Sequence, residues 1–268
     1  RDEGLDVAVD HLGNVAITGY FNNTATFGEG ITINTYGGTN MFVGKFDPNG
    51  RCLWVAKGGG NTYAQGTGVA FNWRGDVVVT GHFTGFFNFG GQKSLRGIGN
   101  SIMFVALFNN GRCFWAHKGD GGGAMIRGTS VGVNKNGDIV VVGDFKGLVQ
   151  FGDGVRLNNP GFGANVFSAL YSASGKCVWA NKAGGGGVCQ GLGVDVARQG
   201  FFYMAGTFKG EMDFGGGHRL QSSAGGALFN AFIAKCNSKG DCVWAKKIGG
   251  AQSSSLAKSV DMDLNGNA

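Results

Sequence analysis

Residues 49–57 read Asn49-Gly50-Arg51-Cys52-Leu53-Trp54-Val55-Ala56-Lys57, and this stretch decides the fold. Copies occupy residues 110–118, 174–182 and 239–247, and each has Gly, Cys, Trp and Lys at the same four places. The tryptophans of the four copies are 61, 64 and 65 residues apart. Self-similarity at a fixed period indicates a repeat architecture. One supersecondary unit of about 62 residues is therefore present four times.

Each copy holds four strand-like runs, which in the first copy are residues 6–10, 15–21, 41–46 and 52–57. Short Gly-containing turns join the first run to the second and the third to the fourth, as in β-hairpins. The second run is almost continuously apolar, which indicates a strand buried on both faces. Radially stacked blades bury a sheet in this way, whereas a two-layer sandwich would show alternation. We predict an all-β fold, a β-propeller built from four-stranded antiparallel blades.

The expected blades cover residues 5–60, 67–123, 129–187 and 192–250, and a fifth begins at 256–268. The long link between the second and third runs contains a Phe-Gly pair in every copy, which predicts a small extra hairpin on each blade. Its phenylalanine is expected to pack beside Phe21 or the counterpart of Phe21. Both ends of the chain supply a first strand, so residues 1–268 are predicted to be one propeller domain from a longer ring or array.

The composition excludes several classes of protein. Gly accounts for 54 of 268 residues and 43% of residues are hydrophobic, but only 15% are charged, so disorder is not expected. The net charge of +6 is not concentrated on one element, so we expect no nucleic-acid partner. No apolar run is long enough to span a membrane. Dinucleotide, P-loop and nucleophile-elbow motifs are missing from the sequence, so we expect no cofactor, no catalytic residues and no enzyme activity.

Cysteine spacing gives one candidate disulfide. Cys236 and Cys242 flank a short turn at residues 237–241 and are predicted to be cross-strand neighbours that could form a disulfide. The alternative is that all six cysteines serve as small apolar side chains. No metal site is expected, because the cysteines and histidines lack ligand spacing. The calcium-loop-like segment that starts at Asp261 aligns with the hairpin turn at residues 10–13 instead.

Three sets of residues are candidate sites. One position, between Gly and Phe at the end of the second run, differs from copy to copy while its neighbours stay the same. It is predicted to face a ligand or partner beside the long loops, although a lack of sequence constraint at an exposed strand end would give the same variation. The residues at this position are Tyr20, His82, Asp144 and Thr207. Two carboxylates are expected to line a central channel, either as a cation or sugar site or simply as a solvated lining: Asp195 and Asp261. One lysine per blade is expected at the rim, to meet phosphates or acidic glycans or to protect the outer edge: Lys57, Lys118, Lys182 and Lys247.

The copies resemble the SBBP-type β-propeller repeat over nearly the whole chain. The resemblance rests on these residues of the first copy: Val7-Ala8-Val9-Asp10, Gly13-Asn14-Val15, Thr18-Gly19-Tyr20-Phe21, Phe27-Gly28, Gly37-Gly38, Phe42-Val43-Gly44-Lys45 and Leu53-Trp54-Val55-Ala56-Lys57. It implies a propeller fold and an extracellular, cell-surface or particle-associated protein, and it implies little about activity. The cysteine near each tryptophan departs from the family pattern.

These features together favour a non-catalytic binding or scaffold module. It would serve protein–protein interaction or the assembly of a surface or particle. A lectin-like propeller that binds glycans is an alternative, and it needs a recurring exposed aromatic residue, for which Trp54 and its copies are the candidates. A central-channel hydrolase or lyase is a second alternative, and it needs acidic or histidine side chains that converge from several blades.

Overall fold

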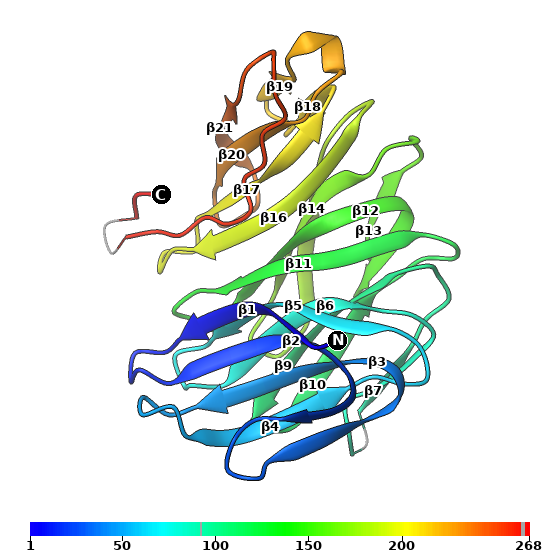
Figure 1. The fold of residues 1–268 in the computed structure, drawn as a ribbon. Helices are drawn as coiled ribbons and strands as arrows, with labels where there is room; N and C mark the ends of the chain where they lie inside the picture. Colours follow the sequence, from blue (N-terminus) through cyan, green and yellow to red (C-terminus); the bar gives the residue numbers. More distant parts are fainter. Residues whose placement is uncertain (92, 264–265) are drawn as a thin grey trace. The chain divides into compact units, whose positions relative to one another are not determined.

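The computed structural model describes residues 1–91, 93–263 and 266–268, and for Tyr36 and Ala224 it describes the backbone only. Antiparallel β-strands make up the regular structure, apart from one short 3-10 turn, Ala224–Gly226, in the described part of the chain (Figure 1). The prediction of an all-β fold with four-stranded antiparallel sheets is confirmed. No described helix is long and apolar enough to cross a membrane.

The chain forms two compact units, residues 1–128 and 129–268. In the first unit the first sheet has the order β1-β2-β3-β4, and the second has the order β10-β9-β6-β5, with a separate hairpin β7-β8. The bounds are β1 Glu3–Val9, β2 Val15–Thr26, β3 Thr32–Phe46, β4 Cys52–Gly58, β5 Ala64–Phe71, β6 Val77–Phe83, β7 Phe86–Asn88, β8 Ser94–Arg96, β9 Ile102–Asn109 and β10 Arg112–Gly119.

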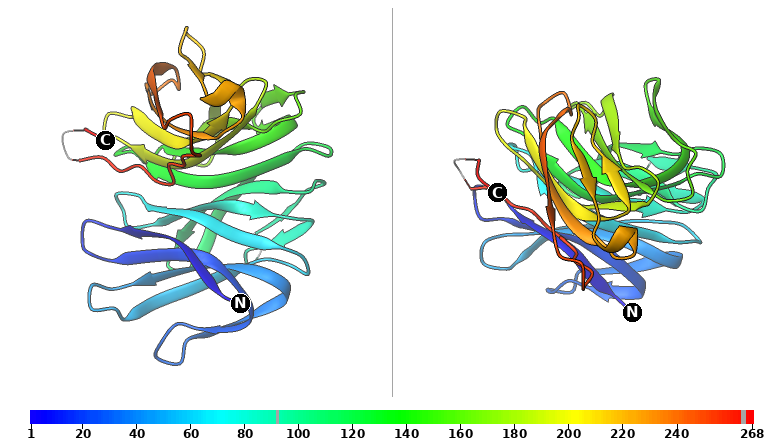
Figure 2. Two further views of the ribbon diagram at one scale, coloured as in Figure 1. Left: turned by 45° about the horizontal axis from the view of Figure 1, so that its top comes forward. Right: turned by 90° about the horizontal axis from the view of Figure 1, so that it is seen from above.

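The second unit repeats the plan. The third sheet has the order β11-β12-β14-β15 with β13 paired to β12, and the fourth has the order β16-β17-β20-β21 with a hairpin β18-β19. The bounds are β11 Met125–Val133, β12 Ile139–Gly152, β13 Val155–Asn159, β14 Asn165–Tyr171, β15 Cys177–Ala183, β16 Val188–Val196, β17 Phe202–Lys209, β18 Glu211–Asp213, β19 Arg219–Gln221, β20 Asn230–Cys236 and β21 Cys242–Ile248. The views in Figure 2 show each sheet as a twisted layer of strands.

The expected extra hairpin is present in every copy. It is formed by β7 with β8, by β18 with β19, by β13 with the end of β12, and in the first copy by Thr24–Thr26 of β2 with residues 32–34 of β3. Its phenylalanine also packs on a phenylalanine of the third long strand, as Phe89 does on Phe104 with ring centroids 5.6 Å apart. Phe104 in turn lies 6.5 Å from Phe83 of the second strand. The sequence argument missed the third-strand ring between them.

Inside each unit, one row of cross-strand partners in the second sheet of the unit packs in a core shared with the first sheet of that unit. In the second sheet Val69, Val79, Ala106 and Ala116 are cross-strand partners in one row, and they belong to a core shared with the first sheet. Ala8, Ala16 and Trp54 of the first sheet pack into that same core. The fourth sheet repeats the row with Val194, Met204, Ala234 and Ala245, within a core shared with the third sheet. Each row is thus covered by the neighbouring sheet of its own unit.

The fifth copy does not begin as a ladder strand. Residues 256–263 carry no assigned strand, because no antiparallel partner strand lies beside them in the described chain. Side-chain contacts hold this segment instead, since Met262 N donates to Asp195 Oδ2 at 2.8 Å. The expected turn after it is present: Asp263 N donates to Asn267 O and Gly266 N to Asp263 O, as in the turn at residues 10–14. Asn265, part of the calcium-loop comparison, lies outside the described residues.

Candidate functional site

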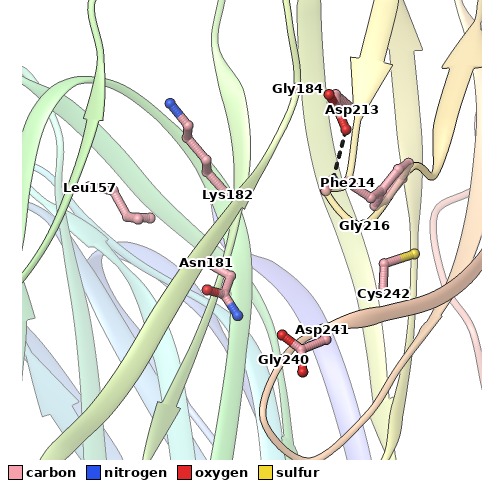
Figure 3. A pocket seen from close by; sticks show the side chains of 11 residues that line it. Leu157, Asn181, Lys182, Gly184, Asp213, Phe214, Gly216, Gly240, Asp241 and Cys242 are labelled. Carbon is pink, nitrogen blue, oxygen red and sulfur yellow. Dashed lines mark hydrogen bonds between the residues drawn. The ribbon is translucent and has the colours of Figure 1, made fainter.

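The second unit contains a cavity of about 640 Å³ between the third and fourth sheets (Figure 3). One side is formed by the end of β15, and the other by the hairpin β18-β19 and by the turn between β20 and β21. The lining residues that carry polar or sulfur atoms in their side chains are Asn181, Lys182, Asp213, Asp241 and Cys242. The cavity is therefore lined by both polar and apolar groups, and it also presents a thiol.

The turn at residues 237–241 is held against β15 by side-chain hydrogen bonds. Trp179 Nε1 donates to Ser238 O at 3.3 Å, and Asn181 Nδ2 donates to Lys239 O at 3.4 Å. Gly240 makes this approach feasible, because a Cβ atom there would lie 2.3 Å from Asn181 Nδ2, and its φ of +84° suits glycine. The local sequence of the turn thus fixes one wall of the cavity.

The opposite wall is held by backbone bonds between the two sheets. Gly184 N donates to Asp213 O at 3.0 Å, and Asp213 N donates to Gly184 O at 3.3 Å. The equivalent bonds in the first unit join Gly59 and Asn88, each at 2.9 Å. The Asp213 carboxylate accepts from Arg219 Nε at 3.0 Å on the hairpin itself. Each extra hairpin of this kind therefore anchors to the end of the preceding copy.

Cys242 brings a second thiol with it. Cys236 and Cys242 are cross-strand partners, so the predicted neighbour relation is confirmed, and both are free cysteines in the structure. Both sulfurs also border a smaller adjoining pocket. The hydrogen bond with Cys242, with burial, raises the pKa of Cys236. The same hydrogen bond lowers the pKa of Cys242. No group of three or more His, Cys, Asp or Glu side chains in the described chain is arranged to hold a metal ion.

The four variable positions do not all reach the surface. Asp144 and Thr207 are each 1% exposed, and Thr207 Oγ1 donates to Asn230 O at 3.2 Å. Tyr20 is partly exposed, and its hydroxyl donates to Glu3 Oε2 at 2.5 Å. The His82 ring packs against Tyr63 at a tilt, with ring centroids 5.8 Å apart, and burial lowers the pKa of His82 to about 4. A binding role at this position remains a prediction, and solvent reaches it only at Tyr20 and His82.

Asp195 and Asp261 meet at one backbone amide. Met262 N donates to Asp195 Oδ2 at 2.8 Å and to Asp261 Oδ1 at 2.9 Å. Burial, with the hydrogen bond to Asp261, raises the pKa of Asp195. The two carboxylates therefore hold the segment that carries Met262 against β16. Their service as a cation or sugar site stays a prediction.

The four lysines of the expected rim share one structural role. Three amino groups donate to a backbone carbonyl of the extra hairpin of their own copy: Lys57 to Asn34 O, Lys118 to Arg96 O at 2.5 Å and Lys182 to Asn158 O at 2.9 Å. Lys247 donates instead to the side chain of Ser223, just after β19, at 3.2 Å. The lysine that follows each tryptophan thus clamps the hairpin to the last strand. Anion binding by these lysines remains a prediction.

Sequence reasoning did not select Asn181, Asp213 or Asp241 as site residues. The hairpin contact that brings Asp213 to the cavity had a signal, because Gly59 to Asn88 and Gly184 to Asp213 span the same 29 residues. No sequence signal marked Asn181 as a site residue, since the equivalent residues in the first two copies are Ala56 and His117.

No protein-family model matches the chain, and a search of curated proteins gives no match.

Proposed function

We propose that the chain is a propeller-type repeat protein that acts as a non-catalytic scaffold and binds a second copy of itself through the open face of its first sheet. The open face is the row Val7, Ile17, Gly44 and Val55, which are cross-strand partners along β1, β2, β3 and β4. The repeated four-stranded sheets and the continuous apolar second strands support the propeller class.

The observation that carries the proposal is a difference between equivalent valines. Val7 is 60% exposed, whereas Val69 and Val194 at the same place in the second and fourth sheets are 4% and 7% exposed. Alternation along β1 puts Val7 and Val9 on one face and Ala8 on the face that packs against the second sheet. The first sheet therefore exposes Val7 at the end of this row, leaves Ile17 and Val55 half-buried, and differs from these other sheets, which bury the equivalent valine.

The chemistry of the open face fits a copy of the same face. Val9 is also 64% exposed, and its row continues through Val15 to Phe46. Two adjacent apolar rows can pack on a copy of themselves, and two antiparallel sheets pack well face to face with side chains interdigitated. Twofold dimers are the commonest assemblies of this kind, because one surface serves both partners. Contiguous exposed apolar rows are typical of interaction sites.

Analytical ultracentrifugation over a wide concentration range tests the proposal. The native protein should show a reversible monomer–dimer equilibrium, and Val7→Asp should weaken it at least about tenfold, because a carboxylate would be buried without a partner. Leu148→Asp is the matched control, since Leu148 is also exposed, at 51%, but lies on the β12-β13 hairpin. A monomer at every concentration, or equal weakening by both substitutions, would refute the proposal.

A further inference from the structure

The fourth sheet differs from the other three at one hairpin position. Cys52, Cys113 and Cys177 face Phe46, Phe108 and Tyr171 across their hairpins, but Cys242 faces a second cysteine, Cys236. The chain therefore contains four equivalent cysteines, of which one has a thiol partner. The other three are built-in controls for the chemistry of this position.

The local ladder brings the two thiols within bonding reach. Cys236 and Cys242 are direct cross-strand partners at the turn end of the ladder, beside a register shift at Lys235. Directly opposite residues of an antiparallel pair have Cα atoms about 4.5 to 5.5 Å apart. Disulfides span Cα separations of about 4.4 to 6.8 Å. A bond between the sulfurs needs no rearrangement of the strands.

The surroundings give the two thiols different roles. Cys236 is 1% exposed and is closed off from solvent, whereas Cys242 is partly exposed and lines the cavity (Figure 3). The thiol of Cys236 hydrogen-bonds the sulfur of Cys242, which lowers the pKa of Cys242 and stabilises its thiolate. Burial instead raises the pKa of Cys113 and of Cys177 to about 12. The thiolate is the nucleophile in disulfide exchange, so Cys242 is the group that attacks.

We propose that Cys236 and Cys242 form a redox-active dithiol site, which small disulfides oxidise through the cavity between the third and fourth sheets. The Cys242 thiolate attacks one sulfur of a disulfide RSSR, forms a mixed disulfide and releases RS⁻. Cys236 then attacks the Cys242 sulfur, and its proton passes to the leaving sulfur, so the second half of the disulfide departs as RSH. The two cysteines are oxidised to one disulfide, and RSSR is reduced to two RSH.

The disulfide would cross-link β20 and β21 next to the turn that Trp179 and Asn181 hold. That turn forms one wall of the cavity, so the redox state is coupled to the rigidity of this wall. Cys189, the sixth cysteine, is buried in the core of the second unit and takes no part.

The test equilibrates the full chain in buffers of reduced and oxidised glutathione, traps free thiols with N-ethylmaleimide, and measures intact mass and disulfide-linked peptides. We expect one disulfide, Cys236–Cys242, and four alkylated cysteines. Cys236→Ser should stop the reaction at a glutathione adduct on Cys242, formed at least about tenfold faster than any adduct on Cys113. Cys242→Ser should abolish both products, and Cys113→Ser should change neither.

Two results would overturn the proposal. One is complete alkylation of Cys236 and Cys242 across the whole redox range. The other is a glutathione adduct that forms on Cys113 as fast as on Cys242 in the Cys236→Ser variant. Circular dichroism of each variant, compared with the native protein, shows whether the fold is kept. If a serine variant unfolds, the peptide map of the native chain alone still decides whether the disulfide forms.

Discussion

The amino group of Lys182 on β15 donates a hydrogen bond to the backbone carbonyl of Asn158 on β13, with the nitrogen and oxygen 2.9 Å apart. The strand β13 belongs to the extra hairpin, so this bond fastens the hairpin to the last strand of its sheet. The first and second copies make the same connection, and in the fourth copy Lys247 donates to the side chain of Ser223, just after β19. The recurring Trp-x-x-Lys spacing therefore encodes a clamp.

Replacing Lys182 by Met should loosen this hairpin without unfolding the sheet. Met keeps the apolar stem and removes the donor, so the expected loss is about 0.5 to 1.5 kcal/mol, the net contribution of one hydrogen bond. Hydrogen exchange should speed up for the amides of β13 and stay unchanged for those of β14. Lys176→Met, on the exposed turn before β15, is the charge-matched control. Equal effects of the two substitutions would show that the clamp contributes nothing.

Gly66 on β5 is a point of close approach between the two sheets of the first unit. A Cβ atom there would lie 2.1 Å from the hydroxyl oxygen of Thr18, which is fully buried and donates to Phe42 O at 2.7 Å. Gly66→Ala should therefore cost about 1 to 3 kcal/mol, because overpacking forces the sheets apart. Chemical denaturation monitored by tryptophan fluorescence measures the loss.

Gly4 on β1 supplies the control for this substitution. Nothing lies within 4 Å of a Cβ atom at Gly4, so Gly4→Ala should leave the free energy of unfolding almost unchanged. Loss of stability in Gly4→Ala equal to that in Gly66→Ala would mean that strand propensity, and not the sheet-to-sheet distance, decides the outcome.

Much of the architecture was readable from the repeat. The Trp54 motif and its copies gave the period, the sheet boundaries, the strand order and the extra hairpins, because each of these depends on neighbours within about 62 residues. The site was less accessible. Asn181 and Asp213 meet at the cavity through contacts between two sheets, and no local propensity encodes which side chains converge there. The prediction for Asp144 and Thr207 failed in another way. Their position varies between copies and is polar, so it was expected to face a ligand or partner, but both side chains are buried.

His82 should make the stability of the first unit depend on pH. Burial, and the charge of Arg127, lower its pKa from 6.5 to about 4, and its Nδ1 atom has no hydrogen-bond partner among the described residues. The unfolded chain takes up a proton below pH 6.5, but the folded chain does so only near pH 4. Stability contributed by neutral His82 is thus fully present above pH 6.5 and is lost as the pH falls toward 4, by about 3 kcal/mol in total.

Denaturation curves at several pH values between 4 and 7 check this slope. His82→Gln should flatten the dependence, because glutamine takes up no proton, so the stability of the variant relative to the native protein should rise as the pH falls from 6.5 toward 4. His11→Gln is the control, because His11 lies exposed on the turn after β1 and should leave the slope as it is in the native protein. Burial disfavours the charged imidazole, so the slope should depend on His82. An unchanged slope in His82→Gln would place the pH dependence on other groups.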